Sequence, residues 1–155
     1  MPELVPVLSK KDIDSLVTKV AHRISTDYRN HDLVLIGVLK GVFVFLSDLV
    51  RCLDIPVQID FIRVFSYGSD VSSSGKINLT KDIEVNIKEK DVLIVEDIVD
   101  TGLTLDHIIK SVYEKNPQSL KLCALIDKME RRDVEINVDY CGFQVKKGFL
   151  VGCGL

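Results

Sequence analysis

The sequence predicts an α/β fold with an open, mainly parallel, twisted sheet flanked by helices. Three runs rich in β-forming apolar residues support this fold class, at 32–39, 92–95 and 119–126, because parallel strands covered on both faces are apolar almost throughout. A stretch with helical periodicity follows each of the first two runs. At 155 residues the chain has the size of one domain, and we expect a single domain over residues 1–155.

Composition excludes several classes of protein. Apolar residues make up 46% and charged residues 28% of the chain, as in ordinary globular proteins. A net charge of −3 argues against a nucleic-acid partner or a membrane surface. The N-terminus shows no secretion signal, and no apolar run is long enough to span a membrane. Cys52 and Cys123 lie in apolar stretches, which favours reduced core thiols and a cytoplasmic location.

Periodicity and capping define the elements of the first half. Ser9 is placed to cap a helix that carries an acid at its third position and ends near Tyr28. The buried strand over 32–39 leads into a strongly apolar helix over 42–53. The next strand, over 56–67, alternates only in part, so we expect it to be longer and closer to a sheet edge than the others.

The second half begins with a serine- and glycine-rich loop at 66–75, which composition alone predicts to be a plain surface hairpin loop. Alternating residues predict returning strand structure over 76–87. The apolar run 92–95 is followed by a helix, and the strand 119–126 by a last short strand at 149–151. The apolar face predicted for that helix comprises Leu105, Ile108, Ile109, Val112 and Tyr113.

The segment from Val92 to Leu105 carries the chemistry. Glu96 and Asp97 stand at the carboxyl end of its strand, and a short polar loop, 100–104, then leads into a helix. Ligands of open α/β sheets bind at this end of the strands, where a helix N-terminus offers free N–H groups to an anion. A Thr-Gly-Thr loop suits a phosphate monoester, whereas two acids suit sugar hydroxyls, a divalent cation or both. Together they indicate a site for ribose 5-phosphate.

This segment resembles the type I phosphoribosyltransferases, whose motif for 5-phosphoribosyl 1-pyrophosphate (PRPP) is an apolar strand, two acids and a D-[ST]-G-x-T loop. Every defining position is matched, by Glu96-Asp97 and by Asp100-Thr101-Gly102-Leu103-Thr104. The resemblance implies the type I phosphoribosyltransferase fold with a flexible active-site lid. The alternative is a receiver-like or Rossmann-like domain whose acids bind magnesium or cap a helix. The spacing of the acids and the lack of a G-x-G-x-x-G pattern argue against it.

Two further segments match the family. Leu39-Lys40-Gly41 corresponds to its pyrophosphate-binding loop, and the resemblance implies a cis peptide bond between Leu39 and Lys40. Without the resemblance this lysine would more often belong to a solvated turn, although a charge and free N–H groups can bind an anion together. Ser66-Tyr67 matches a flexible loop that closes over the active site. The resemblance therefore favours a lid that excludes water over a plain hairpin.

The chain is most similar to the 6-oxopurine branch of the family, the hypoxanthine-guanine phosphoribosyltransferases. The resemblance implies that Lys128 donates to the purine O6, that Phe149 stacks on the base and that Leu150 offers main-chain contacts. Ile98 would pack on the other face of the ring. A 6-oxo group accepts a hydrogen bond and a 6-amino group does not, so a lysine here selects hypoxanthine or guanine over adenine.

The resemblance also implies the reaction, which moves the phosphoribosyl group of PRPP to N9 of hypoxanthine or guanine and gives IMP or GMP and pyrophosphate. Residues 100–104 would bind the 5′-phosphate, and Asp100 would take or orient the N7 proton as general base. Glu96 and Asp97 would contact the ribose, and Mg²⁺ mostly through substrate and water. Pyrophosphate would lie over Lys40 and Gly41. A homodimer or homotetramer is expected.

One departure concerns the C-terminus. The family continues beyond Val-Gly-x-x-Leu with an aspartate and then an arginine, whereas this sequence ends at Leu155. We therefore expect a C-terminal end short of the family's full length, in either a partial sequence or a protein with part of its site missing. The alternatives in function are a non-catalytic PRPP-binding regulator, a truncated inactive form, and a generic magnesium-binding signalling domain. Preference among hypoxanthine, guanine and xanthine stays open.

Overall fold

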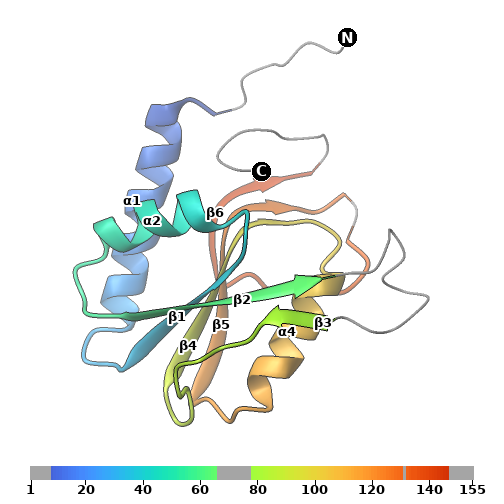
Figure 1. The fold of residues 1–155 in the computed structure, drawn as a ribbon. Coiled ribbons are helices and arrows are strands. Elements are labelled where there is room, and N and C mark those ends of the chain that lie inside the picture. Colours follow the sequence, from blue (N-terminus) through green and yellow to red (C-terminus); the bar gives the residue numbers. More distant parts are fainter. Residues whose placement is uncertain (1–7, 66–77, 131, 147–155) are drawn as a thin grey trace.

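The computed structural model describes residues 8–65, 78–130 and 132–146, which form one mixed sheet with helices on both faces (Figure 1). The six strands lie in the order β3-β2-β1-β4-β5-β6, and all neighbours are parallel except β2 and β3. The helices are α1 (Lys10–Asp27), α2 (Phe43–Cys52) and α4 (Leu103–Tyr113). The strands are β1 (Leu33–Val38), β2 (Gln58–Phe65), β3 (Asn78–Lys81), β4 (Asp91–Val99), β5 (Ser119–Lys128) and β6 (Tyr140–Val145). The α/β prediction is confirmed.

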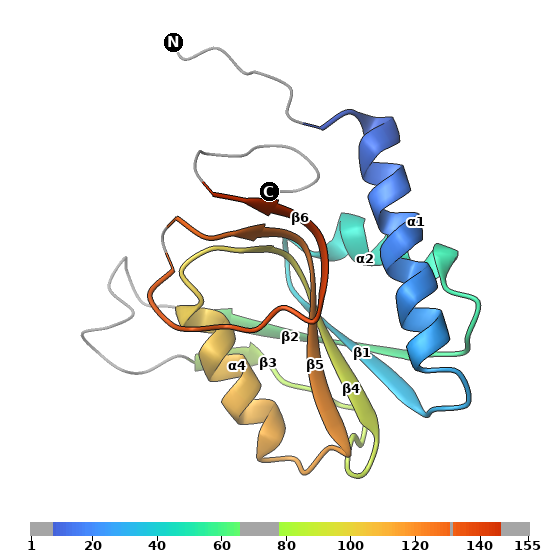
Figure 2. The same cartoon turned by 180° about the vertical axis from the view of Figure 1, so that it is seen from behind.

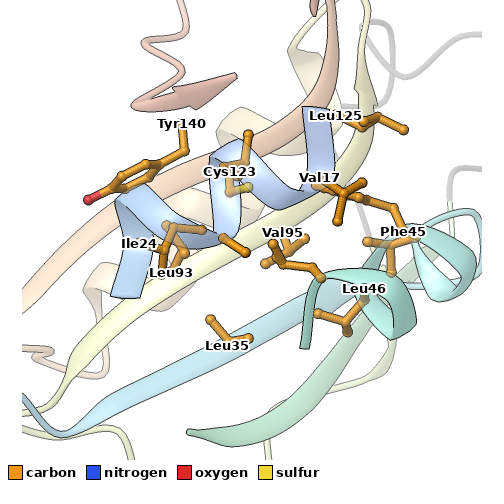
Figure 3. Close-up of a cluster of buried hydrophobic side chains, with 14 of the residues drawn as sticks. Val17, Ile24, Leu35, Phe45, Leu46, Leu93, Val95, Cys123, Leu125 and Tyr140 are labelled. Carbon is orange, nitrogen blue, oxygen red and sulfur yellow. The ribbon is translucent and has the colours of Figure 1, made fainter. Parts of the chain in front are cut away.

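Helices α1 and α2 cover one face of the sheet and α4 covers the other (Figures 1 and 2). The first face holds a core in which side chains of α1 and α2 pack against β1, β4 and β5 (Figure 3). Its members include Val17, Ile24, Leu35, Phe45, Leu46, Leu93, Val95, Cys123, Leu125 and Tyr140. Burial of each large aliphatic side chain stabilises the fold by roughly 1.5–3 kcal/mol.

The order of the strands creates a switch point between β1 and β4. From β1 the chain crosses to β2 on one side, whereas β4 pairs with β1 on the other. Gly37 of β1 therefore stands opposite both Phe61 of β2 and Val95 of β4. Because crossover connections leave in opposite directions here, the segments after β1 and β4 bound a crevice, which is where ligands of open α/β sheets bind.

The predicted first helix is confirmed in detail. Ser9 accepts a hydrogen bond from the backbone N–H of Asp12 at 3.0 Å, and the Asp12 carboxylate accepts one from the N–H of Ser9 at 3.0 Å. This reciprocal capping satisfies two N–H groups that the first turn would leave unpaired. Tyr28 caps the other end, as expected.

Strand structure differs from the expectation around β2 and β3. Strand β2 lies between β1 and β3, so it is not an edge strand, and β4 and β5 are longer than it is. Strand β3 is confined to Asn78–Lys81. Residues 82–87 leave the sheet because the buried Asp60 carboxylate accepts the N–H groups of Glu84 (2.6 Å) and Val85 (2.9 Å), which a strand would pair with its neighbour.

Two smaller expectations are wrong, and one strand was not predicted. Cys52 is exposed at the end of α2, although Cys123 is buried as predicted. Tyr113 is 56% exposed, because it lies about 100° around α4 from Val112, which is buried in the core. Strand β6 was not predicted, since its Tyr-Cys-Gly-Phe-Gln-Val sequence is no continuous apolar run and it pairs only with β5 among the described strands. The strand predicted at 149–151 lies outside the described residues.

Candidate functional site

The segments after β1 and β4 meet directly at the switch point. A β-carbon added to Gly41 would lie 2.6 Å from Oδ2 of Asp97, so only a glycine lets the backbone approach this carboxylate so closely. The Leu39–Lys40 peptide bond is cis, as the resemblance implied, and the N–H of Leu39 donates to the carbonyl of Ile62 at 3.0 Å. The Lys40 side chain is exposed. The structure thus brings a lysine, a glycine and an acid pair to one place.

The two acids lie within β4 rather than after it, because β4 continues to Val99. Asp97 is buried and accepts the N–H of Ile98 at 2.8 Å, while Glu96 is partly buried and accepts the N–H of Asp97 at 3.0 Å. Burial, together with the hydrogen bond to Asp97 and its charge, raises the pKa of Glu96 well above its usual value. Glu96 therefore keeps its proton to a higher pH than an exposed glutamate does.

The loop at 100–104 forms the N-terminus of α4. Gly102 occupies the N-cap position with φ +86°, in the left-handed region that glycine tolerates. Thr101 Oγ1 accepts the N–H of Leu103 at 3.4 Å. One acceptor stands out: Oδ1 of Asp100 is buried, and within the described ranges it has no hydrogen-bond partner. Buried polar atoms are nearly always paired, so this oxygen is available for a ligand.

Lys128 stands at the carboxyl end of β5, beside the Asp100 loop. It is the last residue of β5, not a residue beyond it, since the ladder with β6 extends to Lys128 and Val145. Only 5% of its surface is exposed. The register pairs Asp127 with Val99, so Lys128 lies in the neighbouring strand beside the start of the Asp100 loop.

Arg132, in the charged run that follows β5, is a residue of the site that the sequence did not predict. Its guanidinium forms an ion pair with Asp127 and donates to the carbonyls of Lys128 (3.2 Å) and Asp100 (2.9 Å). Neither spacing nor periodicity could have found it, because the contact depends on how the chain turns back after β5.

Five of the residues predicted for the site remain to be placed. Ile98 is partly buried and packs against the core below α1 and α2. Ser66, Tyr67, Phe149 and Leu150 lie outside the described residues. Within 8–65, 78–130 and 132–146, no group of three or more His, Cys, Asp or Glu could hold a metal ion by itself. None of the helices in those ranges is long and apolar enough to cross a membrane.

A family model described as the phosphoribosyl transferase domain matches residues 7–155. The chain belongs to the phosphoribosyltransferase family. It is 45% identical over 150 residues to the hypoxanthine-guanine phosphoribosyltransferase of Aquifex aeolicus, covering 96% of this chain and 84% of that protein. It is 43% identical over 153 residues to the enzyme of the same name from Dictyostelium discoideum, covering 96% and 85%.

Solved structures agree on the fold. The phosphoribosyltransferase chain superimposes with a TM-score of 0.92 on a hypoxanthine-guanine phosphoribosyltransferase from Bacillus anthracis, crystallised with a HEPES molecule in its active site. The two chains share 42% sequence identity, and the match covers 99% of this chain and 90% of that one. The type I phosphoribosyltransferase fold is therefore confirmed.

Proposed function

We propose that this phosphoribosyltransferase is a purine salvage enzyme that transfers the 5-phosphoribosyl group of PRPP to N9 of hypoxanthine or guanine. The products are IMP or GMP and pyrophosphate. Relatives named hypoxanthine-guanine phosphoribosyltransferase support the substrate class. The observation that carries the proposal is the crevice itself, where Gly41 rests against Asp97 and the Asp100 loop opens α4.

PRPP would occupy the crevice along its length. Its 5′-phosphate would bind the loop Asp100-Thr101-Gly102-Leu103-Thr104, where N–H groups and the dipole of α4 favour an anion. The ribose hydroxyls would face Glu96 and Asp97. Pyrophosphate would lie over Leu39, Lys40 and Gly41, near the exposed lysine charge.

The purine would lie between the two strand ends. Lys128 would donate to O6, and a buried lysine rejects a base that offers an amino group there instead. Ile98 would contact one face of the ring, Phe149 would stack on the other, and Leu150 would contribute main-chain contacts. Together these contacts favour hypoxanthine and guanine over adenine.

The chemistry follows from these positions. The bond between C1′ and pyrophosphate breaks, N9 bonds to C1′ from the opposite face, and the N7 proton passes to Asp100. Oδ1 of Asp100, which has no hydrogen-bond partner among the described residues, is suited to accept it. Nearby carboxylates would stabilise the positive charge that develops at C1′. A lid carrying Ser66 and Tyr67 would keep water away from it.

The residues fit Mg²⁺ as a companion of the substrate. Asp97 and Glu96 offer one or two carboxylates, and magnesium in proteins is usually held by that number together with substrate phosphates and water. When bound, the ion would neutralise charge on the pyrophosphate leaving group.

We further propose that residues 1–155 act as one domain, since a single sheet carries every described part of the site. Free thiols at Cys52, Cys123 and Cys141 suit the reducing cytoplasm. The net charge of −3 gives no reason to expect a nucleic-acid or membrane partner. A homodimer or homotetramer is the expected assembly.

The test is a spectrophotometric assay of PRPP with hypoxanthine, guanine, xanthine and adenine, with and without magnesium. Magnesium-dependent formation of IMP or GMP, with adenine inert, is the expected result. PRPP binding by calorimetry without turnover of any base would overturn the enzyme assignment in favour of a PRPP-binding regulator or an inactive form. Absence of both would remove the PRPP site as well.

A further inference from the structure

The side chain of Arg132 joins the two strand ends that carry the proposed base and sugar-phosphate contacts. Its Nη2 donates to Asp127 in an ion pair and to the carbonyl of Lys128 at 3.2 Å. Its Nε donates to the carbonyl of Asp100 at 2.9 Å. One guanidinium group therefore contacts the end of β5 and the loop after β4 at the same time.

The residues after Arg132 also contact the Asp100 loop. The N–H groups of Asp133 and Val134 donate to the carbonyl of Thr101 at 2.8 and 3.3 Å. A β-carbon on Gly102 would lie 2.8 Å from Cγ1 of Ile136 and 3.3 Å from Cδ of Arg132. The 132–136 segment thus packs directly against the loop proposed to bind the 5′-phosphate.

Burial shields these contacts from solvent. The side chains of Arg132 and Asp127 are only 16% and 7% exposed, so the pair is little screened by solvent. A guanidinium is a planar fork whose donors have fixed directions, and a lysine ammonium cannot reproduce two divergent contacts at once. A shift of the Asp100 loop would therefore move Arg132 and disturb its hydrogen bond to the carbonyl of Lys128. A shift of Lys128 would likewise disturb the hydrogen bond to the carbonyl of Asp100.

We propose that Arg132 is a positioning residue that couples the purine subsite at Lys128 to the sugar-phosphate subsite at 100–104. This inference rests on the proposed function, which defines the two subsites. A ligand that fixes one of the two segments restricts the other through the shared guanidinium, and so strengthens binding at the other subsite. Coupling between sites is reciprocal, so ribose 5-phosphate raises the affinity for hypoxanthine by the same factor as hypoxanthine raises that for ribose 5-phosphate.

The experiment measures that factor by calorimetry, as the affinity for hypoxanthine with and without saturating ribose 5-phosphate. These two ligands cannot react because no pyrophosphate leaving group is present. The unaltered protein is expected to show coupling of roughly 5- to 150-fold, the usual range. In Arg132→Lys the factor falls toward one. The matched control, Arg29→Lys, alters an exposed ion pair with Asp54 and leaves the factor unchanged.

Two more variants distinguish the hydrogen bonds that Arg132 donates to the two carbonyls from its ion pair with Asp127. Asp127→Asn keeps the donors that face the carbonyls of Asp100 and Lys128, so the coupling should persist. The double variant Asp127→Asn/Arg132→Gln leaves a neutral pair without the guanidinium. Because no charge is left buried and unpaired, we expect the protein to fold and the coupling to be lost. Thermal melting confirms folding, and the double variant replaces Arg132→Lys if that protein does not fold.

Coupling that is undiminished in a folded Arg132→Lys or double variant overturns the positioning role. A factor of one in the unaltered protein overturns it too, while turnover in the PRPP assay leaves the proposed function standing. If the unaltered protein binds neither ligand and turns over no base, the proposed function falls first.

Discussion

The backbone of Gly41 lies against the buried carboxylate of Asp97. A β-carbon added at Gly41 would stand 2.6 Å from Oδ2 of Asp97. The segment proposed to hold pyrophosphate is thereby placed by the acid proposed to hold the ribose. We expect the two subsites to move together, because no flexible side chain lies between the Gly41 backbone and the Asp97 carboxylate.

Gly41→Ala should therefore displace the 39–41 segment from Asp97. Misplacement of a binding group by about 1 Å costs roughly 10²-fold in rate, and we expect a loss of kcat/KM for PRPP of that order. Steady-state kinetics at varied PRPP measure it. Ser47→Ala, an exposed change in α2, the helix that follows this segment, serves as control. Equal kinetics in the two variants would show that the contact does not position PRPP.

Asp100→Asn removes the proposed base and keeps the shape of the loop. Turnover should fall by about 10²–10⁴, the usual contribution of general base catalysis, whereas PRPP affinity changes little. Single-turnover kinetics and calorimetry separate the two quantities. Asp106→Asn makes the same change within the first turn of α4, at a residue paired with Lys110, and should leave turnover intact. Comparable losses in turnover and affinity would count against the base role.

Lys128→Met removes the proposed donor to O6 from a buried position. Sites built to bond a substrate group lose about 10²-fold or more when the bond is lost, so kcat/KM for hypoxanthine and guanine should fall by at least that factor. The affinity for ribose 5-phosphate should stay within about threefold of the original. Lys121→Met, at an exposed position of the same strand, is the matched control. Retained selectivity against adenine in Lys128→Met would refute the assignment.

Glu96→Gln should increase stability above the ordinary pKa of a glutamate. Burial and Asp97 raise the pKa of Glu96 in the folded protein, so the folded state binds this proton more tightly than the unfolded state. The stabilisation is full below about pH 4.5 and is lost as pH rises through the folded pKa. Urea unfolding from pH 4 to 8 should show a shallower decline in the variant, whereas the exposed Glu114→Gln keeps the original slope. Identical slopes in all three proteins would contradict the raised pKa.

Local signals were enough to predict much of the fold. The capping pair Ser9 and Asp12 lies within one turn, and the apolar runs of β1 and β4 require only that both faces be covered. The binding segments followed because they stand where those runs end. Their mutual contact, between Gly41 and Asp97, depends on strand order, which the motif alone does not encode.

The rest depends on contacts between distant residues. The alternation at 82–87 indicated a strand, but the Asp60 carboxylate takes its N–H groups, and no local pattern records that competition. Strand β6 owes its structure to pairing with β5 rather than to its own composition. Arg132 has its role only because the turn after β5 returns it to Asp127 and to the Asp100 loop.

The strands that carry the two binding segments, β1 and β4, are hydrogen-bonded neighbours although α2, β2 and β3 separate them along the chain. A ligand that touches both segments binds only after this long-range pair has formed, so its binding free energy adds to the cost of separating the two strands. Backbone amides at the centre of the sheet should then exchange with deuterium more slowly when PRPP is present. The substrate would in this way protect the enzyme from the local opening that proteases exploit.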